Sequence, residues 1–171
     1  MIFAQREKAR SKLDLINDVS RAEIDKWIAK YPEDRQQSAV MAALRIVQDQ
    51  NGGHLTNDLI EAVAEYLHMQ PIAVYEIATF YSMYELKPVG RHVISVCTNI
   101  SCMLCGSDNI MAHLQQKLAI KPGETSADGR FSLREVECLG ACVHAPMLQI
   151  GHRYYENLTP ESLDRILEEL D

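Results

Sequence analysis

The sequence predicts an α+β protein of two parts, a helical bundle followed by a domain with a small mixed sheet of α/β character. Apolar residues recur at helical spacing through the first half, whereas short β-branched runs alternate with helical segments after residue 88. The chain has 171 residues, enough for one ordinary domain with a helical extension. We therefore expect a helical N-terminal region over residues 1–88 and a second domain over residues 89–171.

Four helices are expected in the first region. Ser20 and Glu23 form a capping box at the start of the first helix. The second runs through residues 39–47 and stops at a pair of glycines. Thr56 caps the third, and Pro71 stands in the first turn of the fourth. These helices would form a small bundle. Four aromatic side chains, those of Trp27, Phe80, Tyr81 and Tyr84, are expected in its core, and an apolar surface covered by a larger subunit is the alternative.

The second region predicts a small sheet covered by helices. Its segments are, in order, a strand over residues 92–96 that ends at Cys97, a helix over 108–119, a strand that begins at Phe131 and ends at Cys138, a hairpin over 147–155 and a helix capped by Thr159. A strand–helix–strand crossover makes the first two strands parallel. Their carboxyl ends, and the cysteines that follow them, should therefore lie at one edge of the sheet, where α/β sheets commonly bind ligands.

Charge and hydropathy exclude two classes of partner. The net charge of −7 argues against nucleic acid, because phosphate backbones attract basic surfaces. No apolar run approaches the ~20 residues of a membrane span, and the first residues lack a secretory signal, which predicts a protein of the cytoplasmic side without direct membrane insertion. A basic stretch over residues 1–12 and an acidic one over residues 156–171 are solvated ends that can also serve as docking surfaces.

Four cysteines form two closely spaced pairs, Cys97-x4-Cys102 and Cys138-x3-Cys142, each expected in a short loop. In a reducing compartment such pairs are ligands or catalysts rather than disulfides. Four thiolates complete the ligand set of a [2Fe–2S] cluster, and they equally complete a tetrahedral zinc site. A third interpretation uses Cys102 and Cys105 as the C-x-x-C of a thiol–disulfide oxidoreductase.

The residues around the cysteines favour iron and sulfide. The dithiol interpretation leaves three other cysteines without a role. Gly140 and Ala141 are small enough for backbone N–H groups to approach the sulfur atoms, as in iron–sulfur sites. A Rieske centre needs two histidines, and only His144 lies in either loop, so we expect it beside the site rather than as a ligand. The spacing alone does not exclude zinc.

The cysteine pattern continues into Ala145-Pro146, and the helix upstream reads Val74-Tyr75-Glu76-Ile77-Ala78-Thr79-Phe80-Tyr81-Ser82-Met83-Tyr84. Together these motifs resemble the thioredoxin-like [2Fe–2S] ferredoxins and, within them, the family of E subunits of NADH–quinone oxidoreductase, respiratory complex I. The resemblance covers nearly the whole chain. Related subunits of NAD-linked hydrogenases and formate dehydrogenases share both motifs, so they are the alternative parent complexes.

The resemblance implies a thioredoxin-like second domain that carries one [2Fe–2S] cluster, with Cys97, Cys102, Cys138 and Cys142 as its ligands and no catalytic residue. Cys105 has no counterpart in that ligand set and is expected to be an inert thiol. The Ala145–Pro146 bond falls where thioredoxin-like folds often keep a cis proline.

The resemblance further implies a one-electron carrier that exchanges electrons with FMN on an NADH-oxidising flavoprotein subunit. Other subunits of the peripheral arm would complete the complex on the cytoplasmic side of the inner membrane. The chain has no G-x-G-x-x-G after a predicted strand, so NADH is expected to bind the partner. The chain would then be an enzyme only as a subunit.

Overall fold

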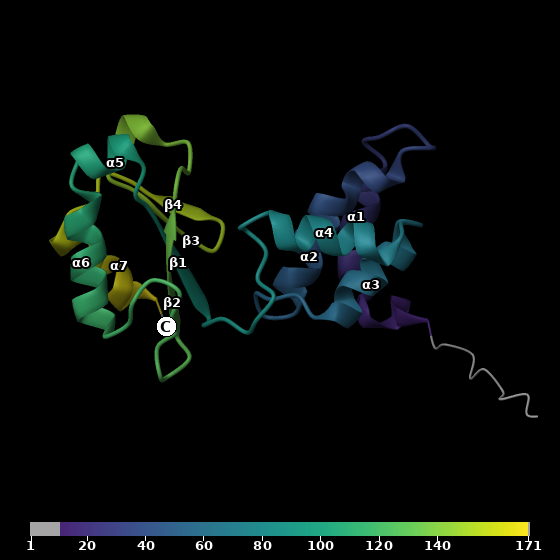
Figure 1. Cartoon of the computed structure of the whole chain (residues 1–171), viewed down its shortest axis with the longest axis horizontal. Helices are drawn as coiled ribbons and strands as arrows, with labels where there is room; N and C mark the ends of the chain where they lie inside the picture. The colour runs from purple at the N-terminus through teal and green to yellow at the C-terminus, as the bar shows by residue number, and fades with distance from the viewer. Residues whose placement is uncertain (1–10, 171) are drawn as a thin grey trace, which may run out of the picture. The chain divides into compact units, whose positions relative to one another are not determined.

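The computed structural model describes residues 11–170, which form two compact units that divide between Pro88 and Val89 (Figure 1). The first unit is helical and the second holds the sheet. Most of the basic stretch expected over residues 1–12 lies outside the described residues. Its last member, Lys12, pairs with Asp58 at 2.6 Å and Glu61 at 2.7 Å. None of the helices between residues 11 and 170 is long and apolar enough to cross a bilayer.

The first unit contains the four expected α-helices, α1 (Asp18–Ile28), α2 (Val40–Gln50), α3 (Asn57–Tyr66) and α4 (Pro71–Phe80), with the short 3-10 helices η1 (Lys12–Leu15) and η2 (Gln36–Ala39). Two sequence signals for helix starts are confirmed. The Thr56 hydroxyl accepts a hydrogen bond from the Leu59 N–H at 3.2 Å, and Pro71 is the first residue of α4. The helices enclose one core, in which Ile24, Leu44 and Val63 are fully buried.

The four aromatic side chains predicted for this core divide into two pairs. Tyr84 is buried, and Trp27 packs partly against the core, as predicted. Phe80 is 81% exposed and Tyr81 is 37% exposed, so the core prediction is wrong for these two. They follow Ala78, the last residue that α4 buries, and their rings meet edge to face, with centroids 5.1 Å apart.

The prediction for the start of α1 is wrong. The helix begins at Asp18, and its cap is Asn17, whose side-chain oxygen accepts a hydrogen bond from the Ser20 N–H at 2.8 Å. Ser20 therefore lies inside the helix instead of capping it. Asparagine caps helices as well as serine does, and it stands three residues earlier, so its signal competes directly with the Ser20–Glu23 capping box.

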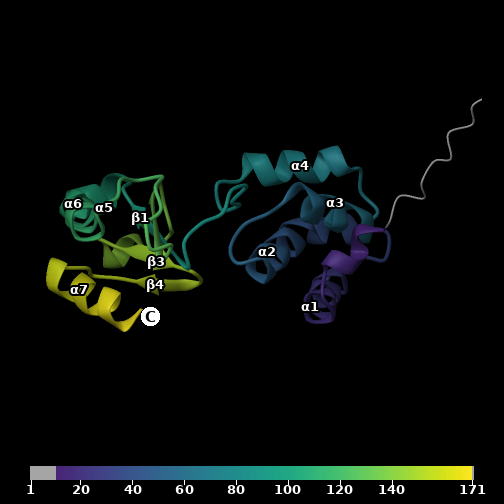
Figure 2. The ribbon, with the colours of Figure 1, turned by 90° about the horizontal axis from the view of Figure 1, so that it is seen from below.

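The second unit is built on a mixed four-stranded sheet in the order β2-β1-β3-β4 (Figures 1 and 2). Its elements are β1 (His92–Cys97), α5 (Ile100–Leu104), α6 (Ser107–Leu118), β2 (Phe131–Val136), the 3-10 helix η3 (Cys142–His144), β3 (Leu148–Ile150), β4 (Arg153–Tyr155) and α7 (Pro160–Glu169). The predicted crossover is confirmed, because β1 and β2 are parallel. The 148–155 hairpin and the Thr159 cap of α7 are confirmed as well.

The helices α6 and α7 share a core with the sheet, including Leu114, Leu133 and Leu163. On the surface, the Asp164 carboxylate of α7 contacts His113 Nε2 at 2.8 Å and Lys117 Nζ at 3.0 Å, both on α6. These contacts and the shared core fix the end of the chain against α6, so the sheet that carries the cysteines has a packed support.

Two of the predicted loops are instead short helices. Cys102 lies in α5 and Cys142 in η3. The helix α5 has five residues, too few for an apolar periodicity, and its start is marked only by Asn99, whose side chain accepts a hydrogen bond from the Ile100 N–H at 2.8 Å. The second strand also ends earlier than predicted, at Val136, so Cys138 follows it by two residues.

Candidate metal centre

The two cysteine pairs lie at one edge of the sheet, as the crossover predicts. Cys97 is the last residue of β1 and is the register partner of Val136, the last residue of β2. Cys138 follows two residues later. The backbone beyond β1 stays tied to its neighbours, because the Thr98 N–H donates to the Val136 carbonyl at 3.0 Å and the Cys97 N–H donates to the Met147 carbonyl at 3.2 Å. Both pairs therefore start at the same level of one sheet.

Cys97 and Cys102 are buried together against Met147, with 2% and 1% of their surfaces exposed. The Cys97 thiol donates to the Glu137 carbonyl at 3.4 Å. Burial, with smaller contributions from a hydrogen bond and the charge of the Cys97 side chain, raises the pKa of Cys102 to about 11. A metal centre that takes Cys102 as thiolate must therefore displace a firmly held proton, which the positive charge of a metal does.

The second pair lies in a turn at the surface, where Cys138 and Cys142 are exposed. The Gly140 N–H donates to Cys138 Sγ at 3.4 Å, so the expected approach of a backbone amide to a sulfur is present. Gly140 has φ +79°, a conformation that L side chains rarely adopt, and the turn depends on it. The Tyr154 hydroxyl donates to the Leu139 carbonyl at 2.8 Å and holds the turn against β4.

The four predicted ligands are brought to the same edge but are not gathered into one cage. Cys97 and Cys102 contact each other, and Cys142 is near enough to Cys102 for its charge to raise the pKa of that thiol. Within residues 11–170, no three side chains of His, Cys, Asp or Glu are grouped closely enough to hold a metal ion. The donor set nevertheless fits a four-thiolate centre, because adjacent thiolates repel one another unless a cation lies between them.

The thiol–disulfide alternative fits this geometry poorly. The five cysteines of the chain, all among the described residues, are free thiols. A redox-active dithiol needs an accessible cysteine of low pKa, whereas Cys102 is buried with a raised pKa. Cys105 is exposed at the end of α5. His144 is exposed beside Cys142, and its backbone, not its ring, ties the turn through a bond from the Asn157 N–H at 2.8 Å.

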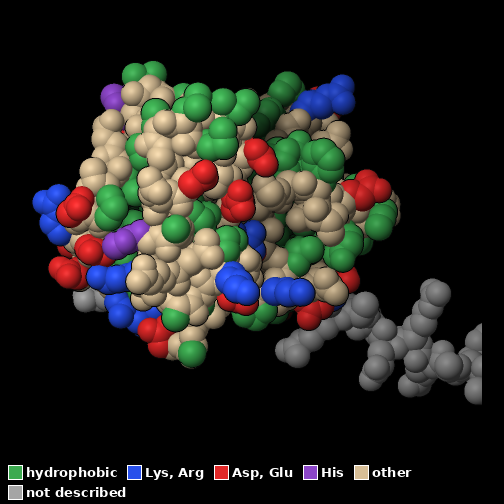
Figure 3. All heavy atoms as spheres, turned by 60° about the vertical axis from the view of Figure 1, so that its left-hand side comes forward, with side chains coloured by type: hydrophobic (Ala, Val, Ile, Leu, Met, Phe, Trp, Pro, Cys, Tyr) green, Lys and Arg blue, Asp and Glu red, His purple; other side chains and the backbone are tan. Residues whose placement is uncertain are grey.

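An uncharged apolar rim surrounds the cysteines, and sequence reasoning missed it. We define this rim by four exposed side chains, those of Ile100, Met103, Leu104 and Val143. Residues 98–107 and 138–151 contain no Lys, Arg, Asp or Glu, and this absence was the available signal. Hydrophobic side chains also gather at the top of Figure 3, the end at which α5 lies in Figure 1. Charge-depleted surfaces with exposed Met are typical of protein interfaces.

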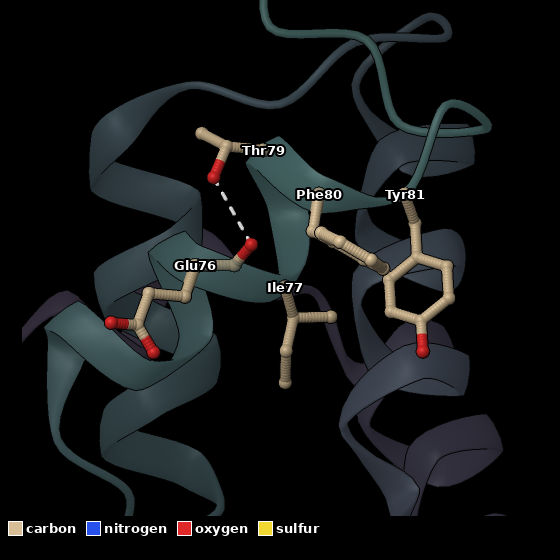
Figure 4. Close-up of a pocket in the computed structure, with 5 residues that line it drawn as sticks. All are labelled: Glu76, Ile77, Thr79, Phe80 and Tyr81. Atoms are coloured by element: carbon tan, nitrogen blue, oxygen red, sulfur yellow. Dashed lines mark hydrogen bonds between the residues drawn. The ribbon is translucent and has the colours of Figure 1, made fainter.

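Two shallow hollows lie beside α4 in the first unit. One, of about 550 Å³, lies at the carboxyl end of the helix (Figure 4). Its lining residues are Glu76, Ile77, Thr79, Phe80 and Tyr81. The other, of about 290 Å³, lies between α3 and the start of α4. Neither is lined by a Cys, so neither adds a thiolate to the candidate centre.

These cysteines and this sheet are those of the thioredoxin-like [2Fe–2S] ferredoxins. The sequence model of that family matches residues 24–171, so the chain belongs to it. The predicted fold, a helical region followed by a thioredoxin-like domain with a small mixed sheet, is thereby confirmed. The Ala145–Pro146 peptide bond, expected to be cis from the resemblance, is cis.

Within the family, the chain is similar to proteins named as the E subunits of NADH-quinone oxidoreductase. It is 50% identical to the one from Rickettsia bellii over 143 residues, which cover 84% of this chain and 86% of that one. It is 47% identical to the E subunit numbered 2 from Rhizobium meliloti over 148 residues, 86% of each chain. These relatives are subunits of an oxidoreductase, as the resemblance implied.

A solved structure shares the fold. An NAD+-reducing [NiFe]-hydrogenase in its air-oxidised state superposes with a TM-score of 0.65 at 24% identity, over 77% of this chain and 22% of the hydrogenase chain. At that identity the likeness concerns the fold alone. It extends over more of this chain than the second unit contains, so the shared fold includes part of the helical unit.

Proposed function

We propose that this chain is a one-electron carrier subunit of NADH-quinone oxidoreductase, in which Cys97, Cys102, Cys138 and Cys142 hold one [2Fe–2S] cluster. Residues 89–171 are the cluster domain, and residues 1–88 are a helical region that precedes it. The observation that carries the proposal is the family match across both cysteine pairs, together with E subunits as relatives at about 50% identity. When bound, such a cluster accepts and releases one electron at a time.

The chain's own residues shape the site for this role. Cys97 and Cys102 would hold the inner side of the cluster in a buried, apolar setting beside Met147. Cys138 and Cys142 would hold its outer side, where both are exposed. The Gly140 N–H already lies on a cysteine sulfur, and such hydrogen bonds stabilise the reduced, more negative state of a cluster. The site is thus insulated on one side and open to a partner on the other.

The electron partner in this proposal is the FMN of an NADH-oxidising flavoprotein subunit. The rim of Ile100, Met103, Leu104 and Val143 supports docking at the cluster edge, because it is apolar, uncharged and exposed around the cysteines. The remaining subunits of the peripheral arm would hold the assembly on the cytoplasmic side of the inner membrane. The alternative is that the chain is the equivalent subunit of an NAD-linked hydrogenase. The hydrogenase structure, at 24% identity, supports this alternative only through its shared fold.

Anaerobic purification followed by metal analysis tests the proposal. We expect iron and acid-labile sulfide in equal amounts, a reddish-brown protein, and a rhombic paramagnetic signal after reduction. One tightly bound zinc ion without labile sulfide would refute the electron-carrier function and identify the second unit as a structural zinc module.

A further inference from the structure

The hydroxyl of Ser107 is fully buried and has no hydrogen-bond partner. Among residues 11–170, two other buried side-chain atoms share this property, the Nε atoms of Arg21 and Arg130. Those two guanidinium groups bond through Nη2 to the carbonyls of Leu13 and Leu170. Ser107 has no second polar atom on its side chain to compensate. A buried hydroxyl without a partner destabilises the fold, and it often marks the place of a bound group.

Ser107 lies at the edge of the sheet that carries the cysteines. It is the first residue of α6, and it shares the buried face of that helix with Ile110 and Leu114, which pack on the sheet. The helix connects the parallel strands β1 and β2, so it runs back along the sheet and its amino end lies at their carboxyl edge. The cysteine pairs that start at Cys97 and Cys138 follow the strands at this same edge.

A short, hydrogen-bonded turn joins Ser107 to the ligand Cys102. The Cys105 N–H donates to the Cys102 carbonyl at 3.1 Å, and the Gly106 N–H donates to the Met103 carbonyl at 3.0 Å. Gly106, with φ +95°, ends this turn and caps α6. Figure 1 shows α5 and the start of α6 at the same end of the second unit. The buried thiol and the buried hydroxyl are therefore held by one continuous piece of backbone.

The chemistry of this corner favours a negatively charged acceptor. The first turn of a helix presents N–H groups and a partial positive charge, to which the Ser107 hydroxyl adds a donor. The side chains on the same face of α6, those of Ile110, Met111 and Leu114, are apolar. A buried water molecule needs several polar partners, and these side chains offer it none.

A [2Fe–2S] cluster held by four thiolates is such an acceptor, because it has a net negative charge that grows on reduction. Residues 98–107 and 138–151 contain no Lys or Arg that could balance this charge. Hydrogen-bond donors and the positive end of α6 are therefore the means by which these loops can favour the reduced state.

We propose that the Ser107 hydroxyl donates a hydrogen bond to a sulfur atom of the bound cluster and raises its reduction potential. The inference rests on the proposed function. Ser107 is then the donor on the buried side of the site, beside Cys97 and Cys102, as the Gly140 N–H is the donor on the exposed side. Loss of the hydroxyl should make the cluster harder to reduce while the four ligands stay in place.

Redox titration of the full chain with its cluster tests this role in Ser107→Ala. We expect normal iron and labile sulfide, and a ratio of reduced to oxidised cluster about tenfold lower at any fixed potential. For a one-electron couple this corresponds to a potential lowered by about 59 mV. Electron–nuclear double resonance gives an independent readout, because the wild type should show one exchangeable proton coupled to the reduced cluster that the variant lacks.

Ser132→Ala is the matched control. Ser132 is also a buried serine, 3% exposed, but it lies near the amino end of β2, at the opposite edge of the sheet. Its hydroxyl accepts a hydrogen bond from the Gly90 N–H at 2.7 Å and contacts Thr125 Oγ1 at 2.6 Å. The control should therefore open the sheet more often, seen as faster amide hydrogen exchange in β1 and β2, and leave the potential unchanged.

The outcomes separate this inference from the function on which it rests. If Ser107→Ala keeps the wild-type potential and the exchangeable coupling, the hydroxyl does not bond the cluster, and the proposed function stands. If Ser132→Ala lowers the potential as much as Ser107→Ala does, the shift reports a loosened sheet and the inference is wrong. A wild-type chain without iron and labile sulfide would refute the proposed function and this inference together.

Discussion

Cys97 lies directly opposite Val136 at the shared carboxyl end of the parallel strands β1 and β2. Each strand therefore delivers a cysteine pair to the same end of the sheet, one starting at Cys97 and the other two residues beyond Val136. A shift of the register by a few residues would separate the pairs, because each residue advances a strand by about 3.3 Å. The strand pairing is thus what makes a joint site possible.

Replacement of single cysteines should divide them into two groups. Ala at Cys97, Cys102, Cys138 or Cys142 is expected to abolish the cluster, since each change removes one thiolate of a four-thiolate set. Ser at Cys105 should leave it intact, because Cys105 is exposed beyond α5. Iron and labile sulfide per chain, with visible absorbance, measure the outcome.

Disulfide reduction provides the counter-test for the same thiols. A thiol–disulfide oxidoreductase would reduce insulin in a manner that depends on Cys102 and Cys105 and ignores Cys138. We expect no such activity. A chain that loses insulin reduction in Cys105→Ser, while Cys138→Ala keeps all of it, would contradict the ligand assignment.

The stability of the helical unit should decrease at alkaline pH because of Tyr84. Burial raises the pKa of Tyr84 to about 12 from an ordinary value of 10.0. Below pH 10 the phenol is protonated in both the folded and the unfolded state, so Tyr84 does not lower the free energy of unfolding. Between pH 10 and 12 only the unfolded state ionises, so up to roughly 2–3 kcal/mol is lost. Fluorescence of Trp27, the single tryptophan and part of this unit, reports unfolding in urea.

Tyr84→Phe separates this effect from general alkaline loss. The variant should lose roughly 1 kcal/mol at pH 8, where the bond to the Met41 carbonyl is missing, and should lose less than the wild type between pH 10 and 12. Tyr66, whose pKa is also raised to about 12 by burial and by Asp25, keeps part of the dependence in both proteins. Parallel stability curves for wild type and variant would show that Tyr84 ionises freely.

Gln48→Leu should destabilise the helical unit by about 2–4 kcal/mol. The change removes the buried hydrogen bond from the Glu85 N–H and the partly buried bond to the Met83 carbonyl. Gln50→Leu is the matched control, because the half-buried Gln50 also bonds two backbone groups, the Leu15 carbonyl and the Asn17 N–H, but through hydrogen bonds that are exposed to solvent. Water replaces those bonds, so the control should cost about 1 kcal/mol or less. Equal losses in the two variants would show that burial of Gln48 adds nothing.

Local signals in the sequence predicted the start of an element well where no second residue nearby could serve as the cap. Thr56, Pro71 and Thr159 begin helices, and the crossover between residues 97 and 131 made β1 and β2 parallel. Asn17 and Ser20 are both good caps three residues apart, and local chemistry did not rank them. The short helix α5 was not predicted, because five residues are too few to show a helical periodicity.

The candidate site was predicted as a set of thiols, but its surroundings were not. Cysteine spacing and the strand–helix–strand crossover bring the two pairs together. Both features can be identified in the sequence of one chain. The exposure of Phe80 and of Leu104 follows from which surfaces a partner covers, and the sequence of one chain lacks that information. An aromatic residue at helical spacing has the same pattern whether its own core or another protein buries it.

The isolated chain should not oxidise NADH, even with its cluster in place. The sequence has no dinucleotide-binding fingerprint, and the hollow at the end of α4 holds a single carboxylate and no basic side chain for pyrophosphate. Mixed with the flavoprotein subunit, the chain should enter a stable complex in which NADH reduces the flavin. The cluster becomes reduced there only if its potential is high enough.

Rapid mixing followed by paramagnetic resonance checks this prediction, because the flavin and the cluster give different signals. The control is the flavoprotein subunit with the Cys138→Ala chain, in which flavin reduction should persist while the cluster signal is lost. NADH binding by the isolated chain, together with failure to associate with the flavoprotein subunit, would contradict the assignment. That pair of results would require a nucleotide site on this chain, whereas neither hollow beside α4 is lined by a Lys or Arg that could hold a pyrophosphate.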